Sequence, residues 1–132
     1  MVMKTAVELI AAARAQVETV TATDAAEQAA TGAAVLLDVR ESEEWQHGHI
    51  EGSVAAPRGL VEFFADPTSP RHKKALDPAG RVIVVCASGA RAALAAATLQ
   101  DMGYQDIAVL DGGLKGWMAA GLPTNEHEYS GI

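Results

Sequence analysis

The sequence predicts an α/β domain with a mainly parallel central sheet of about five strands and helices on both faces. Two observations predict this fold class. Short apolar runs alternate with segments of helical length, and Gly or Pro separates most of them. The strongest runs, residues 34–39 and 81–85, are almost continuously apolar, as expected of strands that helices cover on both faces. The length of 132 residues is typical of one domain.

The first predicted element is a helix over residues 5–16, ahead of the alternating pattern. Four of its apolar residues recur at the spacing of one helix face: Ala6, Leu9, Ile10 and Ala13. We therefore expect a single domain, residues 1–132, that carries an extra N-terminal helix. A strand rich in Val and Thr follows at 17–22, and then a helix that is capped by Thr23 or Asp24 and ended by Gly32.

The remaining elements follow in the same alternation. Ser42 is a candidate cap for a short helix, and Gly103 ends the clearest helix, which is rich in Ala. The sequence 121–123, Gly-Leu-Pro, ends the last helix, and residues 124–132 are predicted to form a polar tail. The expected strands are 34–39, 53–56, 81–85 and 107–110, and the expected helices are 42–45, 59–65, 91–102 and 114–120.

Charge and cysteine content exclude several function classes. The net charge is −7 and no stripe of Lys and Arg offsets it, so we expect no nucleic-acid partner. No apolar run has the roughly 18 residues of a membrane-spanning helix, and the N-terminal segment lacks the pattern of a signal peptide. A single cysteine cannot form an intramolecular disulfide. We therefore expect a cytoplasmic protein that has no membrane partner.

The loop that follows the strongest strand carries the best candidate chemistry. Cys86 ends this strand and Arg91 begins the clearest helix, with four small residues between them: Ala87, Ser88, Gly89 and Ala90. A tight turn into a helix start directs several N–H groups at one point, which forms an anion-binding nest. Such a nest favours the thiolate of a cysteine, the form that acts as a nucleophile. The alternative is an inert cysteine in the apolar core.

Three segments of the chain resemble the signatures of the single-domain rhodanese family, and the likeness extends over about residues 20–123. The first signature is Leu37-Asp38-Val39-Arg40 with Glu44, Trp45 and the run 48–53. The second is the loop 86–91, and the third is the run 110–117 followed by Gly121-Leu122-Pro123. One position departs from the family pattern, because Glu51 stands where the family usually places Pro.

This resemblance implies a sulfurtransferase with two steps. Cys86 would attack a small anionic sulfur donor such as thiosulfate and carry the sulfur as a persulfide. A small thiol, a protein thiol or cyanide would then accept it. The loop residues Ala87, Ser88, Gly89, Ala90 and Arg91 would bind the donor, and no cofactor is implied. The physiological donor and acceptor and the oligomeric state stay open.

Two arginines are candidates for binding the donor anion. Arg91 lies in the loop itself, although it could instead be a structural partner of a carboxylate such as Glu44. Arg58 follows a short strand on the expected ligand side, and related sequences with Pro-Arg-Gly place it near the site. Asp38 and Arg40 are interpreted as scaffold residues.

The sequence also offers a metal reading and two rival functions. His47 and His49 lie in a short loop without a second cysteine, so we expect no metal site. Phosphatases of the related cell-cycle dual-specificity type have five residues between Cys and Arg, whereas this chain has four. A regulatory domain without catalysis, or a sulfur relay to one protein acceptor, is the other alternative.

Overall fold

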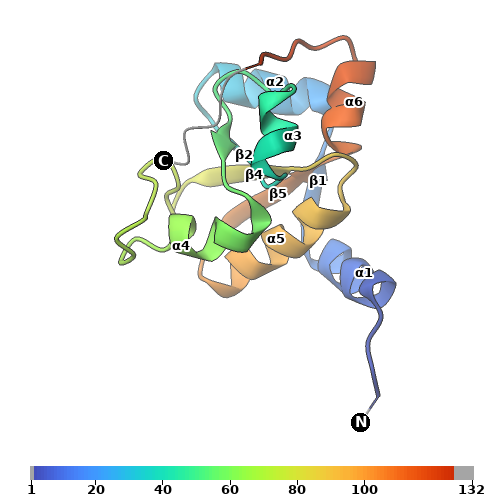
Figure 1. Cartoon of the computed structure of the whole chain (residues 1–132), viewed down its shortest axis with the longest axis vertical. Helices are drawn as coiled ribbons and strands as arrows, with labels where there is room; N and C mark the ends of the chain where they lie inside the picture. Colours follow the sequence, from blue (N-terminus) through green and yellow to red (C-terminus); the bar gives the residue numbers. More distant parts are fainter. Residues whose placement is uncertain (1, 127–132) are drawn as a thin grey trace.

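The computed structural model describes residues 2–126 and contains one five-stranded sheet in which all strands are parallel (Figure 1). The strand order is β1-β5-β4-β2-β3. The strands are β1 Glu18–Val20, β2 Val35–Asp38, β3 Val54–Ala55, β4 Arg81–Val85 and β5 Asp106–Leu110. The predicted fold class is thereby confirmed.

Six α-helices and one 3-10 turn connect and cover these strands. They are α1 Ala6–Gln16, α2 Ala22–Ala30, α3 Ser42–Gln46, η1 Arg58–Leu60, α4 Val61–Ala65, α5 Ala90–Asp101 and α6 Gly113–Ala119. Each predicted helix is present within a few residues of its expected bounds. Of the predicted polar tail, Asn125 pairs with His49 in an antiparallel bridge, and residues 127–132 lie outside the described part of the chain.

Local predictions at three helices in the N-terminal part are wrong. Helix α2 is capped by Thr21 and not by Thr23 or Asp24, because the extended backbone of Thr21 lets its hydroxyl accept the Asp24 N–H at 3.2 Å. Strand β1 therefore ends at Val20. Ser42 is the first residue of α3, and Glu41 is its cap. The apolar face expected on α1 is also largely exposed, since only Ala13 is buried in this helix.

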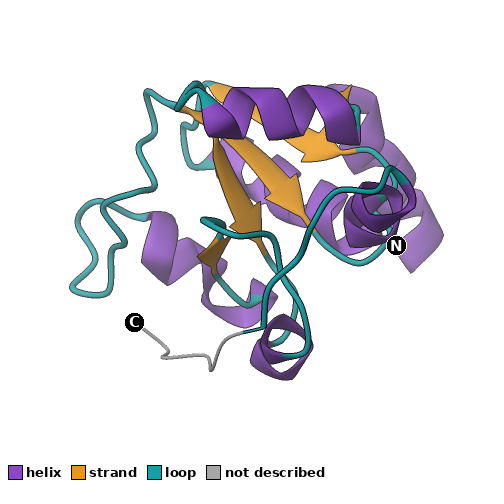
Figure 2. Ribbon diagram, turned by 90° about the horizontal axis from the view of Figure 1, so that it is seen from above, coloured by secondary structure: helices purple, strands orange, loops and turns teal. Residues whose placement is uncertain are grey.

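Helices lie on both sides of the sheet (Figure 2). The core accordingly consists of two apolar layers, one on each side of the sheet. On one side, strand residues such as Val82 and Val84 pack against α4 and α5. On the other side, Ile83 and Val85 pack with residues of α2 and α6. The alanines of α5 allow its backbone to lie close to the sheet, and those that are fully buried are Ala92, Ala93, Ala95 and Ala96.

The topology determines where a ligand site is expected. The chain leaves β2 toward β3 and leaves β4 toward β5, so the two central strands send their following loops in opposite directions. In parallel α/β sheets, ligand sites lie beyond the carboxyl ends of the strands at this reversal. Cys86 is the first residue after β4 and therefore lies at the carboxyl end of this strand. Within residues 2–126, no helix has the length and apolar character needed to cross a membrane.

Candidate active site

Cys86 is held at the edge of the core with its sulfur in a polar contact. It continues the alternation of Val82 and Val84 along β4, so its side chain belongs to the apolar layer under α5 and is only 1% exposed. Its Sγ nevertheless accepts a hydrogen bond from the N–H of Gly89 at 3.0 Å. The cysteine is therefore buried, as the inert alternative expects, but it also has the donor that a thiolate site requires.

The turn from Cys86 into α5 depends on Gly89. This residue is the N-cap of α5 and has φ 118° and ψ −20°, a conformation that residues with a Cβ rarely adopt. Its carbonyl accepts the N–H of Ala93 at 2.9 Å, while its own N–H faces the sulfur. In the described part of the chain, the N–H groups of Ala87 and Ser88 donate to no protein acceptor.

The first residues of α6 fix the direction of the loop amides. The N–H groups of Leu114 and Lys115 donate to the carbonyls of Cys86 and Ala87 at 2.8 and 3.1 Å. In a planar trans peptide the C=O and the following N–H point in opposite directions, and no peptide bond in the described segment 2–126 is cis. The N–H groups of Ala87 and Ser88 consequently point away from α6.

Gly113 is the residue that permits this contact. A Cβ on Gly113 would stand 2.6 Å from the carbonyl carbon and oxygen of Ala87, and its backbone has φ +59°. No L-residue with a side chain fits this position without displacing the loop. The third sequence signature therefore acts as a support for the second one.

Glu44 connects the first sequence signature to the loop. Its carboxylate accepts two hydrogen bonds from Arg91, at 2.7 and 3.0 Å. These hydrogen bonds lower the pKa of Glu44 from its ordinary value of 4.5 to about 2 and raise the pKa of Arg91. The structural pairing considered for Arg91 is confirmed, and its part in binding a donor stays a prediction.

Arg40 fixes the segment that carries Glu44. Its guanidinium pairs with Asp38 at 2.8 Å, with exposed fractions of 6% and 2%, and also donates to the carbonyl of Gly48 at 2.8 Å. A buried pair of this kind holds its geometry because either partner alone would be an uncompensated charge. These contacts agree with the interpretation of Asp38 and Arg40 as scaffold residues, which stays a prediction.

Arg58 lies apart from the loop in this arrangement. It pairs with Glu62 at 3.0 Å and donates to the hydroxyl of Thr98 at 3.1 Å. Thr98 is eight residues beyond Ala90, about 12 Å along α5. The predicted role of Arg58 in substrate binding therefore finds no support in these contacts, and it stays a prediction.

His47 and His49 both have structural contacts. The Nδ1 of His47 lies 2.7 Å from the carbonyl oxygen of Glu43, and the Nδ1 of His49 lies 2.8 Å from that of Trp45. The rings of Trp45 and His49 also stack, with centroids 3.6 Å apart. Among residues 2–126, no group of three or more His, Cys, Asp and Glu side chains could hold a metal ion.

One residue near the loop was not predicted. The Nη2 of Arg14, in the last turn of α1, lies 3.6 Å from the position that a Cβ on Gly89 would occupy. Arg14 is distant in sequence from all three signatures, so spacing could not reveal it. The only signal was its place near the end of the predicted N-terminal helix.

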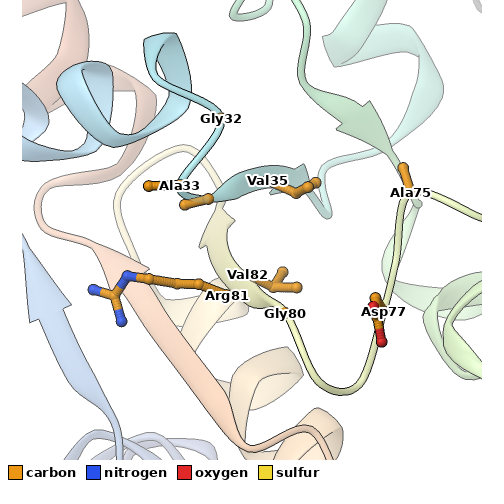
Figure 3. A pocket seen from close by; sticks show the side chains of 9 residues that line it. Gly32, Ala33, Val35, Ala75, Asp77, Gly80, Arg81 and Val82 are labelled. Carbon is orange, nitrogen blue, oxygen red and sulfur yellow. The ribbon is translucent and has the colours of Figure 1, made fainter.

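A pocket of about 150 Å³ lies at the end of the sheet opposite the Cys86 loop (Figure 3). It is lined by residues at the amino ends of β2 and β4, including Val35 and Val82. Arg81 extends away from the Asp77 side of this pocket in Figure 3 and pairs with Glu18 and Asp106. The pocket has few converging polar groups, and it lies at the end of the sheet opposite Cys86, so it does not belong to the Cys86 site.

Comparison with known proteins identifies a family. The family model of the rhodanese-like domain matches residues 21–120. The thiosulfate sulfurtransferase GlpE of Pseudoalteromonas translucida is 33% identical over 86 residues, which are 65% of this chain and 74% of that protein. The putative sulfur carrier protein YrkF of Bacillus subtilis is 32% identical over 82 residues, or 62% of this chain.

Some relatives are much longer than this chain. It spans 40% of YrkF and 24% of the tRNA uridine(34) hydroxylase of Chlamydia abortus, which is 35% identical over 83 residues. Among solved structures, a protein of unknown function from Rhodopseudomonas palustris, described as a possible tyrosine phosphatase, is 35% identical with a TM-score of 0.86. That likeness covers 95% of this chain and 97% of the other.

A second solved structure, the thiosulfate sulfurtransferase of Pseudomonas aeruginosa, has a TM-score of 0.75 and is 26% identical. The match covers 92% of this chain and 22% of that protein.

The support of the loop by α6 can be tested with Gly113→Ala. The new Cβ would meet the Ala87 backbone and would force φ +59° on a residue with a side chain. We expect a loss of about 2–4 kcal/mol in the free energy of unfolding, from about 1 kcal/mol of left-handed strain plus overpacking. Urea denaturation measures it.

Gly121→Ala is the matched control, because Gly121 has φ +79° but nothing within 4 Å of its Cβ position. Gly121→Ala should lower the free energy of unfolding only by the cost of the left-handed backbone, about 1 kcal/mol. Equal losses in the two variants would show that a Cβ at position 113 does not clash with the Ala87 backbone.

The pairing of Glu44 with Arg91 predicts a pH-dependent contribution to stability. Because the folded-state pKa of Glu44 is about 2, the contribution is complete above about pH 4.5 and declines as the pH falls toward 2. The pair is more than one-third exposed, so screening limits the contribution to about 1 kcal/mol or less. Urea midpoints of wild type and Glu44→Gln should therefore differ at pH 6 and converge toward pH 2.5.

The control is Glu43→Gln, a neighbouring carboxylate for which the structure shows no side-chain ion pair among the described residues. A difference between wild type and Glu44→Gln that stays constant from pH 6 to 2.5 would contradict the ion pair.

Proposed function

The chain belongs to the rhodanese-like domain family, and on this premise we propose that it is a sulfurtransferase that carries sulfur as a persulfide on Cys86. The single observation that carries the proposal is the contact of the Cys86 sulfur with the Gly89 N–H at 3.0 Å. Relatives named as a thiosulfate sulfurtransferase and a sulfur carrier support sulfur transfer as the general activity.

In the first step, the Cys86 thiolate attacks the outer sulfur of a donor such as thiosulfate. A new S–S bond forms to Cys86, the S–S bond of thiosulfate breaks, and sulfite leaves with the electron pair. The product is a Cys86 persulfide, whose terminal sulfur is anionic. The N–H groups of Ala87, Ser88 and Gly89 are suited to stabilise this charge, because the first two donate to no acceptor in the described part of the chain and the third already donates to sulfur.

In the second step, an acceptor takes the outer sulfur. A thiolate acceptor attacks it, the bond between the two sulfur atoms of the persulfide breaks, and the electron pair returns to Cys86 as thiolate. Cyanide as acceptor would leave as thiocyanate by the same displacement. The acceptor is a small thiol or a protein thiol, and the single cysteine is suited to a reducing cytoplasm.

The contacts support the following division of roles. Cys86 is the nucleophile, the loop from Ala87 to Ala90 binds the anion, and Arg91 keeps the start of α5 in place through Glu44. If Arg91 also contacted the donor, its guanidinium would have to bind the donor and the Glu44 carboxylate at the same time.

Cys86→Ser tests the nucleophile. Serine is nearly isosteric but carries no thiolate at neutral pH, so we expect sulfur transfer from thiosulfate to cyanide to be abolished while the unfolding midpoint changes little. Intact mass after thiosulfate treatment should show one added sulfur atom in the wild type and none in the variant. Dithiothreitol should remove that sulfur atom. Substantial transfer by the serine variant would refute the proposal.

A phosphatase is the second candidate, because the similar protein of Rhodopseudomonas palustris is described as a possible tyrosine phosphatase. Two features favour sulfur transfer over this reaction. Four residues instead of five separate Cys86 from Arg91, which makes a nest better suited to sulfur than to a phosphoryl group. Arg91 is also engaged with Glu44, whereas a phosphatase needs that charge on the phosphate.

We expect the wild type to transfer sulfur from thiosulfate faster than it hydrolyses p-nitrophenyl phosphate. One glycine inserted between Gly89 and Arg91 should widen the nest and lower thiosulfate turnover. Both rates are measured at equal enzyme concentration and pH. Faster hydrolysis than sulfur transfer by the wild type would reverse the assignment.

A further inference from the structure

We propose that Arg14 of α1 is a substrate-binding residue of the Cys86 loop, where it contacts the anionic oxygens of a donor such as thiosulfate. The inference rests on the proposed sulfurtransferase function and names the cation that recognises its donor. It assigns a role to the extra N-terminal helix, which precedes the segment 21–120 that matches the family.

The position of α1 brings Arg14 to the loop. The helix is capped by Thr5, which forms a reciprocal capping box with Glu8, and it packs against α5 (Figure 1). Ala13 is the one buried residue of α1, so the last turn of this helix packs on the domain at Ala13, and Arg14 is the next residue. The Nη2 of Arg14 then lies 3.6 Å from the Cβ position at Gly89, the residue whose N–H meets the Cys86 sulfur.

The charge of Arg14 is not neutralised by the protein. Among residues 2–126, it makes no ion pair with a carboxylate and no side-chain hydrogen bond. The two arginines expected to bind the donor are both engaged, Arg91 with Glu44 and Arg58 with Glu62. Of these three arginines, only Arg14 has its full charge available to a ligand.

The location of this charge is unfavourable unless an anion binds beside it. The N-terminus of α5 and the N–H groups of the loop carry partial positive charge, and a cation next to them is repelled. An arginine in the last turn of α1 also offsets the dipole of its own helix, but any orientation of the side chain would do so. A bound anion between the guanidinium and the loop amides would convert the repulsion into attraction on both sides.

The chemistry of the site indicates the class of donor. A guanidinium matches the paired oxygens of a sulfonate-like group, while the sulfur to be transferred faces Cys86. The net charge of −7 repels such donors at long range, so a local cation is needed at the loop. We therefore infer a donor with an oxyanion group, such as thiosulfate or an organic thiosulfonate.

The first experiment does not depend on catalysis. Cys86 is the only thiol in the chain, so its alkylation can be followed with two reagents of nearly equal size, anionic iodoacetate and neutral iodoacetamide. We expect Arg14→Gln to lower the ratio of the iodoacetate rate to the iodoacetamide rate about five- to tenfold at low salt. An intermediate ratio is expected for Arg14→Lys.

The matched control is Lys4→Gln, which removes the same charge ahead of α1 in an exposed segment. Its ratio should equal that of the wild type. A ratio unchanged in Arg14→Gln, or lowered equally by Lys4→Gln, would overturn the proposal, since Arg14 would then act only through net charge.

The second experiment tests the donor itself. Under a two-step mechanism, Arg14→Gln should raise the KM for thiosulfate about five- to tenfold, with a smaller change in kcat and none in the KM for the neutral acceptor 2-mercaptoethanol. Equal changes for donor and acceptor would indicate a structural effect and would refute donor binding by Arg14.

The two experiments also separate this inference from the proposed function. A lowered alkylation ratio in a protein that forms no persulfide would support Arg14 as the anion-binding residue of the loop while refuting sulfur transfer. Persulfide formation with an unchanged alkylation ratio and an unchanged KM in Arg14→Gln would support sulfur transfer while refuting the role of Arg14 in anion binding.

Discussion

The site depends on a division of the Cys86 loop into a carbonyl side and an amide side. Two N–H groups at the start of α6 bind the carbonyls of Cys86 and Ala87 at 2.8 and 3.1 Å, and peptide planarity then turns the next two N–H groups the other way. Because these donors are fixed before any ligand arrives, an anion meets a preorganised site and little reorganisation is needed. The close approach of α6 requires Gly113, since any Cβ there would meet the Ala87 backbone.

The three signatures cooperate through this loop although they are far apart in sequence. The first reaches it through Glu44, which holds Arg91 at the start of α5, and the buried pair of Arg40 and Asp38 keeps the Glu44 segment in place. The third reaches it through the backbone of α6. Under the proposed function, the chemistry is concentrated in one cysteine and its neighbouring amides, and most other residues of the signatures serve to position them.

Sequence alone was sufficient for the fold class and the order of elements, because apolar runs and glycines are local signals, and the loop 86–91 indicated Cys86 as the candidate nucleophile. It could not decide between functional and structural roles for the arginines. The position of a long side chain depends on which hydrogen-bond acceptors the fold brings near it, as it brings Glu62 and Thr98 near Arg58. Arg14 was missed for the same reason, since only the packing of α1 against α5 places it beside Gly89. The cap of α2 was misplaced because Thr21, Thr23 and Asp24 are all good caps, and the end of β1 decides among them.

The single cysteine has a consequence for oxidative damage. A cysteine that is oxidised to the sulfenic acid is commonly rescued when a second thiol condenses with it to form a disulfide, but these 132 residues contain no second thiol. Further oxidation to the sulfinic acid would be irreversible for this site. Burial of Cys86, with 1% of its surface exposed, therefore slows the access of peroxide as well as placing the sulfur under the amides. Under the proposed function, the same burial means that an acceptor would have to bring its thiol into the loop to collect the sulfur, which would favour slender acceptor groups over bulky ones.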